Sequence, residues 1–471
     1  MTKTYITTAI PYVNGNPHIG HAMDYLLADV FYRYHSLCGD EIRFQAGTDE
    51  HGNKIFNKAT SQNKNVEDYV RENSDHFKDF IEKLNVHPTD FIRTTDKDHE
   101  RRCQEIWKKL EEHIYPAEYE GWYCEGCERF VTDKEVEENC GTCPDHQKPY
   151  EKLSEKNYYL RISDFKDEIK SAIESDRMKI LPEFRKKEIL NLLEDTPDVS
   201  ISRPKKNLSW GIEVPGDDSQ VMYVWIDALS NYITVLGYPD NAIDEWWPAA
   251  VQFVGKDILR FHAIIWPAML LGLGLPLPKV ITSHGHILSD GQKMSKSIGN
   301  VVDPLEVLDR HGLDAFRYYF LRHVDNFVDS DFTWEKFENS YNNELANDLG
   351  NLVQRLSTLC KKNQLAYQEK TTNFSPAYIE SMAEFNFNAA FEHVWEHVQS
   401  LNKQIDEEKP WELAKNGETE RLKTVLSHLV DQVLHAALEL SPFLPDTAKK
   451  ITEIFKQSPI VPPVAPLFPK N

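Results

Sequence analysis

The sequence is poor in basic residues. Among its 471 residues, 53 Lys and Arg stand against 75 Asp and Glu, giving a net charge of −22. Non-specific binding to nucleic acids depends on Lys and Arg that neutralise phosphates, so this balance excludes a general nucleic-acid binder. Any RNA partner must therefore meet a local basic surface. The chain also lacks internal repeats and low-complexity segments.

Long apolar runs are scarce as well. The first ten residues already alternate as a strand does, which leaves no room for the charged and apolar segments of a signal peptide. We therefore expect a cytoplasmic protein. Residues 261–278 are almost wholly apolar, but they include His262 and three prolines, which a membrane-spanning helix tolerates poorly. This stretch predicts a buried helix and loop.

Cysteine is infrequent and unevenly placed. Four of the seven cysteines lie between positions 124 and 143, in the pattern Cys124-x₂-Cys127 and Cys140-x₂-Cys143. Paired cysteines at this spacing are typical of a tetrahedral zinc site in a reducing compartment. His146 also stands at ligand spacing from Cys143, so either Cys140 or His146 could complete the site. Four protein ligands leave no open position, which predicts a structural zinc ion.

The length of the chain predicts two to four domains. Its first part alternates predicted strands and helices. Residues 4–10 predict a strand, residues 11–17 a turn and residues 18–34 a helix, which together form the start of a βαβ unit. A further strand, 41–46, ends in the polar run Gly47-Thr48-Asp49-Glu50-His51-Gly52. Residues 222–225 and 251–257 predict two more strands. Polar residues at the carboxyl ends of parallel strands predict a ligand site there.

The fold class predicted is thus α/β, a Rossmann-like doubly wound parallel sheet in a catalytic domain, with a zinc-binding insertion, followed by an α-helical bundle. We expect the catalytic domain at 1–115 and 205–330, and the insertion, with its zinc knuckle, at 116–204. A linker that contacts the tRNA stem is expected at 331–345, and the helical anticodon-binding domain at 346–471. The ordinary proportion of hydrophobic residues, 41%, fits a soluble globular protein.

The peptide His18-Ile19-Gly20-His21 falls at the predicted junction of strand, loop and helix. His18 and His21 are three residues apart in the first helical turn, so their rings should face the same side, beside N–H groups that attract phosphate. Gly20 leaves room for a flat base. The pair predicts a nucleotide site.

A second peptide, Lys293-Met294-Ser295-Lys296-Ser297, lies in a glycine-flanked loop. The mobile ammonium groups of Lys293 and Lys296 could follow the charge that develops on a departing pyrophosphate. Stabilising such charge in the transition state accelerates phosphoryl chemistry. A solvated lysine loop is the alternative when the peptide is considered alone.

Together, in this order, the two peptides resemble the signature sequences of the class I aminoacyl-tRNA synthetases. Further motifs narrow the resemblance to the methionyl-tRNA synthetase family, in its zinc-binding bacterial type without a C-terminal dimerisation domain. These motifs span nearly the whole chain: residues 9–12, residues 47–52, residues 223–228, and residues 255–258 with 261–262 and 266–267.

The resemblance implies a role for particular residues. Asp49 would meet the ammonium group of methionine, and Asp257 the ribose of ATP. Aromatic side chains suit a polarisable thioether, which agrees with the implied pocket. The residues implied to bind methionine, besides Asp49, are Ile10, Tyr12, Trp225, Ala228, Tyr232, Ile258, His262 and Trp266.

The resemblance also bears on the zinc site and on tRNA. Relatives carry a Cys-Pro-x-His peptide matching residues 143–146, which favours Cys124, Cys127, Cys143 and His146 as ligands, with Cys140 as the alternative to His146.

By the same resemblance, Asn351, Arg355 and Trp411 would read anticodon bases by hydrogen bonds and stacking. Without the resemblance, a polar helix surface and a packing tryptophan would be preferred.

The implied reaction joins methionine to ATP, with Mg²⁺, and then transfers methionine to the terminal ribose of tRNA(Met), initiator tRNA included. We expect a monomer that binds no membrane. Synthetases for Leu, Ile, Val or Cys share both signatures, but the insertion is too short for a full editing domain, which weighs against the first three. A simpler nucleotidyltransferase or a silent RNA-binding homologue would leave the helical region or the intact signatures unexplained.

Overall fold

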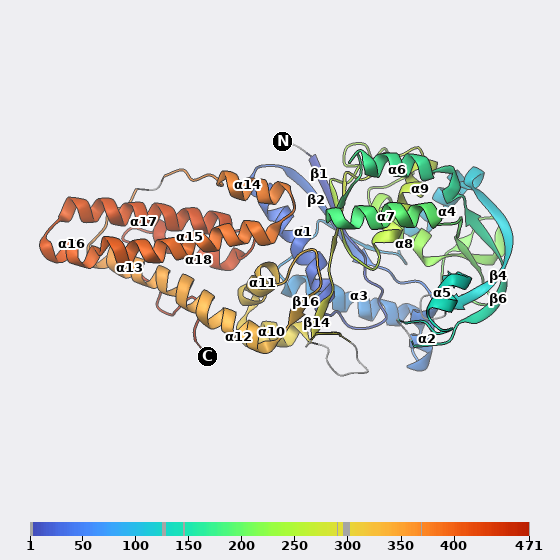
Figure 1. Ribbon diagram of the computed structural model, residues 1–471, viewed down its shortest axis with the longest axis horizontal. Helices are drawn as coiled ribbons and strands as arrows, with labels where there is room; N and C mark the ends of the chain where they lie inside the picture. Colours follow the sequence, from blue (N-terminus) through green and yellow to red (C-terminus); the bar gives the residue numbers. More distant parts are fainter. Residues whose placement is uncertain are drawn as a thin grey trace.

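A computed structural model describes residues 3–124, 129–144, 147–289, 291–294, 302–368 and 370–470. Figure 1 shows an α/β part, on the right, joined to an elongated group of helices that extends to the left. The N-terminus lies beside the central sheet, and the C-terminus lies under the helical part. Within the described residues, no helix combines the length and the apolar character that crossing a membrane requires.

The central sheet has six strands, all parallel, in the order β3-β2-β1-β12-β13-β7. Their bounds are β3 (Asp90–Arg93), β2 (Glu41–Thr48), β1 (Lys3–Thr8), β12 (Val251–Gly255), β13 (Val280–His284) and β7 (Lys179–Leu181). The order reverses at β1, where the chain runs outward to β2 and later returns to β12. Such a switch point is where open α/β sheets bind ligands.

Helices cover both faces of this sheet because its strands are apolar on both sides. Neighbouring residues of β1 illustrate this, since Tyr5 belongs to one hydrophobic core and Ile6 to the other. The Ile6 face packs against α1 (Ile19–Leu37) and α11 (Leu313–Arg322), and the Tyr5 face against α4 (Lys97–Lys109), α8 (Val224–Thr234) and α9 (Trp266–Gly272). Helices α2 (Asn53–Ser61) and α3 (Val66–Lys83) follow β2.

Residues 111–222 contain two small antiparallel sheets and several helices. One sheet contains β5 (Arg129–Val131), β4 (Ile114–Cys124), β6 (Glu151–Leu160) and β8 (Val199–Ser200); another contains β10 (Glu213–Val214), β11 (Asp217–Met222) and β9 (Ser202–Pro204). The helices of this region are η1 (Glu111–His113), α5 (Asp133–Glu138), η2 (Ile162–Asp164), α6 (Lys166–Glu174) and α7 (Glu183–Asp195). Strand β7 comes from the same stretch of chain but pairs with β13 in the central sheet.

The strand predicted at residues 222–225 is wrong. Strand β11 ends at Met222 and pairs antiparallel with β9, and helix α8 begins at Val224. A short apolar run fits a buried strand and the first turn of a buried helix equally well, and here the helix forms. By contrast, the buried helix and loop predicted at 261–278 are confirmed as the π-helix η3 (Phe261–Ile265) and α9.

A small three-stranded sheet is formed by chain segments between β13 and the helical part. It contains β15 (Gln292–Lys293), β14 (Ile287–Ser289) and β16 (Ser330–Phe332), with α10 (Pro304–His311) nearby. The helical part then begins with α12 (Trp334–Ser340), the π-helix η4 (Tyr341–Gly350) and α13 (Asn351–Lys362). It continues with α14 (Pro376–Ala383), α15 (Phe387–Glu408), α16 (Pro410–Asn416), α17 (Thr419–Leu440) and α18 (Pro445–Lys456).

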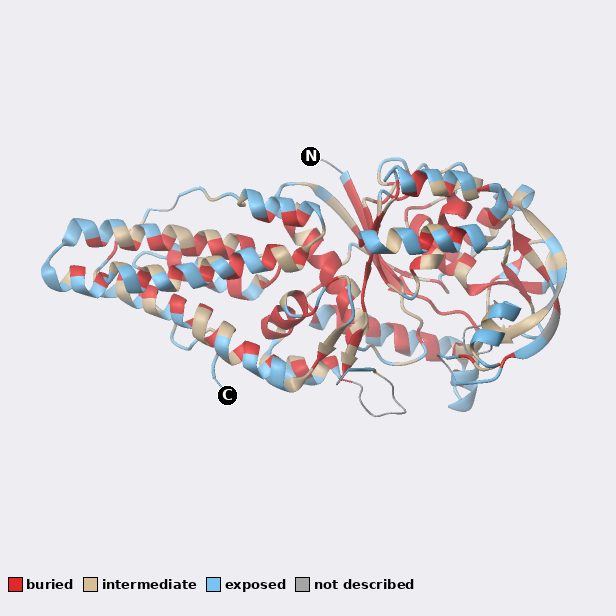
Figure 2. Ribbon diagram, in the orientation of Figure 1, coloured by how far each residue is buried: buried red, intermediate tan, exposed pale blue. Residues whose placement is uncertain are grey.

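The buried residues, red in Figure 2, fill the sheet region and the inner faces of these helices. One hydrophobic core runs without interruption from the sheet through α1 and α11 into the helical part. The predicted fold class, a doubly wound parallel sheet followed by a helical bundle, is confirmed.

Candidate active site

A cleft of about 1030 Å³ opens at the carboxyl ends of β1, β2, β12 and β13. Its walls come from segments that are far apart in sequence: residues 9–21, Asp49, residues 224–232, residues 255–262 and residues 284–287. This is the edge of the sheet where the sequence predicts a ligand site. The cleft is large enough for a nucleotide and a small substrate together.

His18 and His21 stand on one side of the cleft at the start of α1. Their rings face the same side, as the spacing predicts, and stack with centroids 3.7 Å apart. The backbone N–H of Gly20 donates to Nδ1 of His18 at 3.1 Å, and the N–H of His18 donates to Nδ1 of His21 at 3.2 Å. Because both Nδ1 atoms accept, the proton of each neutral ring lies on Nε2. Burial lowers the pKa of His21 well below its ordinary value, so this ring is neutral at pH 7.

Two acidic groups accompany these rings. Asp24, one turn further along α1, lies 3.1 Å from Nε2 of His284 at the end of β13. Burial raises the pKa of Asp24. Burial alone would lower the pKa of His284, but Asp24, helped by the Gly285 carbonyl and Asp257, raises it. Burial also opposes ionisation of Asp257, but His286 and the backbone outweigh it and lower its pKa to about 2. The side chain of Asp257 is therefore ionised at neutral pH, on the side of the cleft where the nucleotide is expected.

The opposite half of the cleft is largely apolar and aromatic. Trp225 lines the cleft and stacks on Phe261 with ring centroids 3.7 Å apart, which restrains its indole. The residues predicted for methionine that line this half are Ile10, Tyr12, Asp49, Trp225, Ala228, Tyr232, Ile258 and His262. Trp266 is fully buried behind this wall, with its ring 5.8 Å from that of Tyr232.

The loop that carries Asp49 is held on several sides. The N–H of Asp49 donates to the carbonyl of Pro11 at 2.9 Å, which fastens the loop to the end of β1. Glu50, fully buried, accepts both bonds from the fork of Arg93 at 2.7 and 2.9 Å. The indole of Trp210 donates to the carbonyl of Glu50 at 2.6 Å. These bonds hold the backbone of the loop, and with it Asp49, in a fixed position.

The lysine loop is only partly described. Strand β15 ends at Lys293, and Met294 lines the cleft. The loop therefore departs from the rim of the site. The side chain of Lys293 and the whole of Lys296 lie outside the described residues, so their roles stay predictions.

The predicted zinc region brings two of its cysteines together. Cys124, at the end of β4, and Cys143 are both buried in a small cluster with Val131 and Tyr150. Cys140 is exposed and has a positive φ of 52°. Cys127 and His146 lie outside the described residues. Two buried thiols in one small cluster suit a metal ion as their shared partner.

The three residues predicted for the anticodon lie on the helical part. Asn351 is exposed at the first position of α13, and Arg355, one turn later, bonds Asp406 of α15 at 2.6 Å. The indole of Trp411 is 44% exposed in the first turn of α16. An exposed tryptophan offers a face on which unpaired bases can stack.

Sequence reasoning overlooked several residues of the cleft. Asp24 could have been found from its position three residues after His21, which places it on the same helix face. His284, the last residue of β13, and His286 just after it could have been found from their place at the ligand edge of the sheet.

Comparison with known proteins agrees with this geometry. A model of the family "tRNA synthetases class I (M)" matches residues 4–153 and 145–357. The methionine–tRNA ligase of Caldanaerobacter subterraneus subsp. tengcongensis is 42% identical over 475 residues, covering 96% of this chain and 74% of the relative. That of Bacillus subtilis is 39% identical, covering 95% of this chain and 72% of the relative.

The chain is also similar to solved structures. The methionyl-tRNA synthetase of Mycobacterium tuberculosis in complex with methionyl-adenylate superimposes with a TM-score of 0.90 at 34% identity, over 100% of this chain and 99% of the other. The free form of the same protein gives a TM-score of 0.85 at 31% identity, over 100% and 98% of the two chains.

Proposed function

The chain belongs to the methionine type of the class I tRNA synthetases and is an aminoacyl-tRNA ligase, and on this premise we propose which of its residues carry each step. The reaction activates L-methionine with ATP and then transfers methionine to tRNA. The observation that carries the assignment is the cleft itself, which gathers an aromatic pocket, the loop of Asp49 and a stacked histidine pair.

In the first step, an oxygen of the methionine carboxylate attacks the α-phosphorus of ATP. The bond from that phosphorus to the bridging oxygen breaks, and pyrophosphate leaves with the electron pair. Mg²⁺ would be bound with ATP and would offset part of the charge of its phosphates. His18 and His21 present Nε2–H groups to the phosphates, and Asp257 accepts from the ribose. Lys293 and Lys296 would stabilise the departing pyrophosphate. Positioning and charge stabilisation suffice, so no protein nucleophile is required.

Methionine would occupy the apolar half of the cleft. Asp49 pairs with its ammonium group, because a buried carboxylate gains from a cationic partner. Trp225, Tyr232 and the ring of Tyr12 surround the thioether, and sulfur–aromatic contacts are favourable by a fraction of a kcal/mol to about 1.5 kcal/mol each. Trp266 supports the ring of Tyr232 from behind.

In the second step, the 2′-hydroxyl at the 3′ end of tRNA(Met), initiator tRNA included, attacks the aminoacyl carbonyl, and AMP leaves. We propose that the anticodon meets the helical part at Asn351, Arg355 and Trp411, and that residues 331–345 contact the stem. Splayed bases stack on aromatic rings and hydrogen-bond to side chains in this way. We further propose that the protein acts as a monomer in the cytoplasm.

A structural zinc ion would be held by Cys124, Cys127, Cys143 and His146. The burial of Cys124 and Cys143 in one cluster supports these two, and the exposure of Cys140 argues for His146 as the fourth ligand. When bound, the ion would cross-link the short strands and loops of this region, which have a small core of their own.

The function is tested by ATP–pyrophosphate exchange with a panel of amino acids. We expect exchange with methionine and at least a hundredfold weaker exchange with Leu, Ile, Val and Cys, because those side chains lose the thioether contacts or the fit. Exchange with another amino acid but not with methionine would refute the assignment. Asp49→Asn should raise the KM for methionine by about tenfold or more, with a smaller effect on the KM for ATP.

A further inference from the structure

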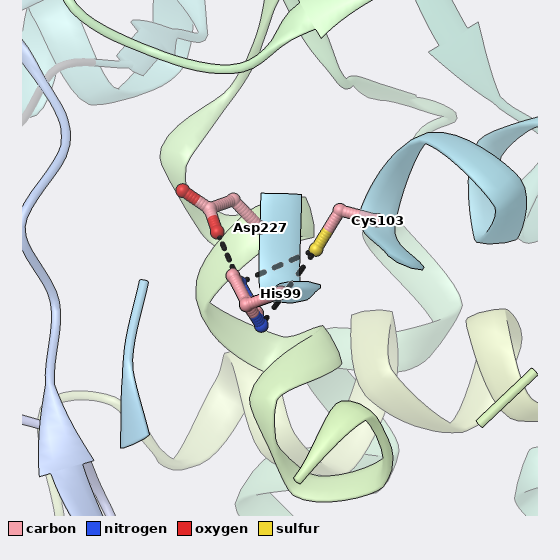
Figure 3. A group of neighbouring side chains, drawn as sticks. All are labelled: His99, Cys103 and Asp227. Carbon is pink, nitrogen blue, oxygen red and sulfur yellow. Dashed lines mark hydrogen bonds and ion pairs between the residues drawn. The ribbon is translucent and has the colours of Figure 1, made fainter. Parts of the chain in front are cut away.

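A buried group of polar side chains lies behind the methionine half of the cleft, where none of its members was predicted to act. Figure 3 shows His99, Cys103 and Asp227 pointing toward one another from helices α4 and α8. Oδ1 of Asp227 lies 2.7 Å from Nε2 of His99, and Sγ of Cys103 lies 3.3 Å from the same nitrogen. All three residues are almost completely buried. Polar groups are kept in such a place only when they are well bonded.

The group reaches the substrate side through His51. Oδ2 of Asp227 lies 2.6 Å from Nδ1 of His51, so one carboxylate joins two rings. His51 is two residues from Asp49, in the loop after β2. Asp227 lies in the first turn of α8, next to Ala228 and two residues from Trp225. The carboxylate therefore connects the loop that meets the ammonium group with the helix that lines the side-chain pocket.

These donors could be taken for a metal site, since their ligand atoms lie within 4.8 Å of one another. The hydrogen bonds argue otherwise. Both nitrogens of His99 are already engaged, Nε2 with Asp227 and Nδ1 with the hydroxyl of Thr234 at 2.7 Å. Burial raises the pKa of the Cys103 thiol well above its ordinary value, which disfavours the thiolate that binds zinc. The arrangement is that of a hydrogen-bonded clamp.

We propose that Asp227 is a positioning residue for methionine: by holding His51 and His99 at once, it sets the separation between the Asp49 loop and helix α8. This inference rests on the proposed function, because it assigns the pocket to methionine. The substrate's ammonium group and side chain must be bound together, and small errors in such spacing are costly. The clamp lies on the methionine side of the cleft, so its loss should affect methionine more than ATP.

Asp227→Asn tests the clamp because it preserves shape while removing the charge. We expect the KM for methionine in pyrophosphate exchange to rise by about tenfold, with the KM for ATP changing less than about twofold, since one charge-assisted bond of a buried pair is lost. Equal KM values for methionine in the variant and the wild type would overturn the proposal. So would a proportional rise in both KM values. Wild-type exchange with methionine is measured first, because its absence would refute the function rather than the clamp.

A second pair of variants keeps the test informative if Asp227→Asn does not fold. His51→Ala removes the partner, whereas His51→Asn retains an N–H near the position of Nδ1. We expect His51→Ala to raise the KM for methionine by about tenfold and His51→Asn to recover most of this loss. Equal defects in the two variants would contradict a hydrogen-bonded role.

Asp314→Asn is the matched control for loss of a buried carboxylate. Asp314, in α11, accepts from the backbone N–H of Thr447, in α18, at 2.6 Å, away from the cleft. Asp314→Asn should lower stability without changing the KM for methionine.

Zinc analysis of the purified protein tests whether His99, Cys103 and Asp227 hold a metal ion instead. Zinc content that is unchanged in Cys103→Ala supports the clamp, whereas loss of one zinc ion per chain in that variant would overturn it.

Discussion

The hydroxyl of Tyr232 lies 2.7 Å from Nε2 of His262, and both side chains line the methionine half of the cleft. Nδ1 of His262 lies 3.0 Å from the carbonyl of Ile258 and can only donate there. Nε2 of the neutral ring must therefore accept from the tyrosine. Burial lowers the pKa of His262 to about 4, which keeps this tautomer neutral throughout the physiological range.

Tyr232→Phe removes that donor and leaves a buried nitrogen without its partner, a cost of about 1–3 kcal/mol. We expect the KM for methionine to rise by about fivefold or more because the pocket wall relaxes. Tyr5→Phe is the control, since the buried Tyr5 hydroxyl donates instead to the backbone carbonyl of Tyr232 at 2.9 Å. It should lower the thermal midpoint and leave this KM unchanged. Steady-state pyrophosphate exchange and thermal unfolding of both variants decide the point.

Gly52→Ala should disturb the pocket through the backbone. Gly52 has a φ of +112°, where a side chain is strained, and a Cβ atom there would overlap the hydroxyl of Tyr12. We expect Tyr12 to be displaced and the KM for methionine to rise by about tenfold. Gly216→Ala, at φ +81° with open space around it, shares only the backbone strain. If Gly216→Ala altered the KM for methionine equally, displacement of Tyr12 would not be the cause.

Much of this architecture follows from local pattern. Alternating residues predicted β1, and turn residues and helical spacing predicted α1. The three-residue separation of His18 and His21 predicted that their rings face the same side, and in the structure they stack. Each of these features depends on neighbours in the chain, which a sequence displays directly.

Other features depend on partners far away in sequence. The bonds from Asp227 to His99 and His51 join residues 128 and 176 positions apart, and no spacing rule connects them. Strand β7 has only three residues, too few to show a period. The strand predicted at residues 222–225 is wrong because so short an apolar run shows no period, and most residues of the helix that forms there are buried, which leaves little contrast between its faces.

Arg317 should be a major source of stability between the sheet and the helical part. It is fully buried, pairs with Asp29 of α1 at 2.7 Å and donates to the carbonyls of Pro442 and Phe443 at 2.9 and 2.6 Å. Arg317→Met leaves several acceptors unpaired, so we expect a loss of about 3–5 kcal/mol in urea denaturation. Arg310→Met removes an exposed arginine that pairs with Glu306 and should cost less than about 1 kcal/mol. Similar losses in the two variants would contradict this account.

Methionine binding should depend on pH through His51. Burial disfavours its charged form, but Asp227 on α8, together with Glu100 on α4 and Glu50 in its own loop, raises its pKa above the ordinary 6.5. The second buried ring bonded to the Asp227 carboxylate, besides that of His51, is that of His99. Below pH 6.5, the ordinary pKa of histidine, His51 is therefore charged and forms an ion pair with Asp227. This ion pair is lost as the pH rises through the raised pKa of His51. We expect the KM for methionine to increase over that interval.

Asp227→Asn removes the main cause of the raised pKa of His51, so the same rise in the KM for methionine should move to lower pH or disappear. The KM for ATP, measured in parallel, reports instead on the Asp24 and His284 pair of the nucleotide half. A pH profile for methionine that is identical in the two proteins would assign the dependence to another group.

Zinc content should separate the two candidates for the fourth ligand. Cys124 and Cys143 are buried together, so replacing either with Ala should abolish zinc binding and lower the thermal midpoint, because the short strands around them have little core of their own. Cys140 is exposed with a positive φ of 52° and would have to turn inward to bind. Cys140→Ala should therefore retain one zinc ion per chain by mass spectrometry, and His146→Ala should lose it. The reverse pattern would make Cys140 the ligand, and full retention in all four variants would exclude the site.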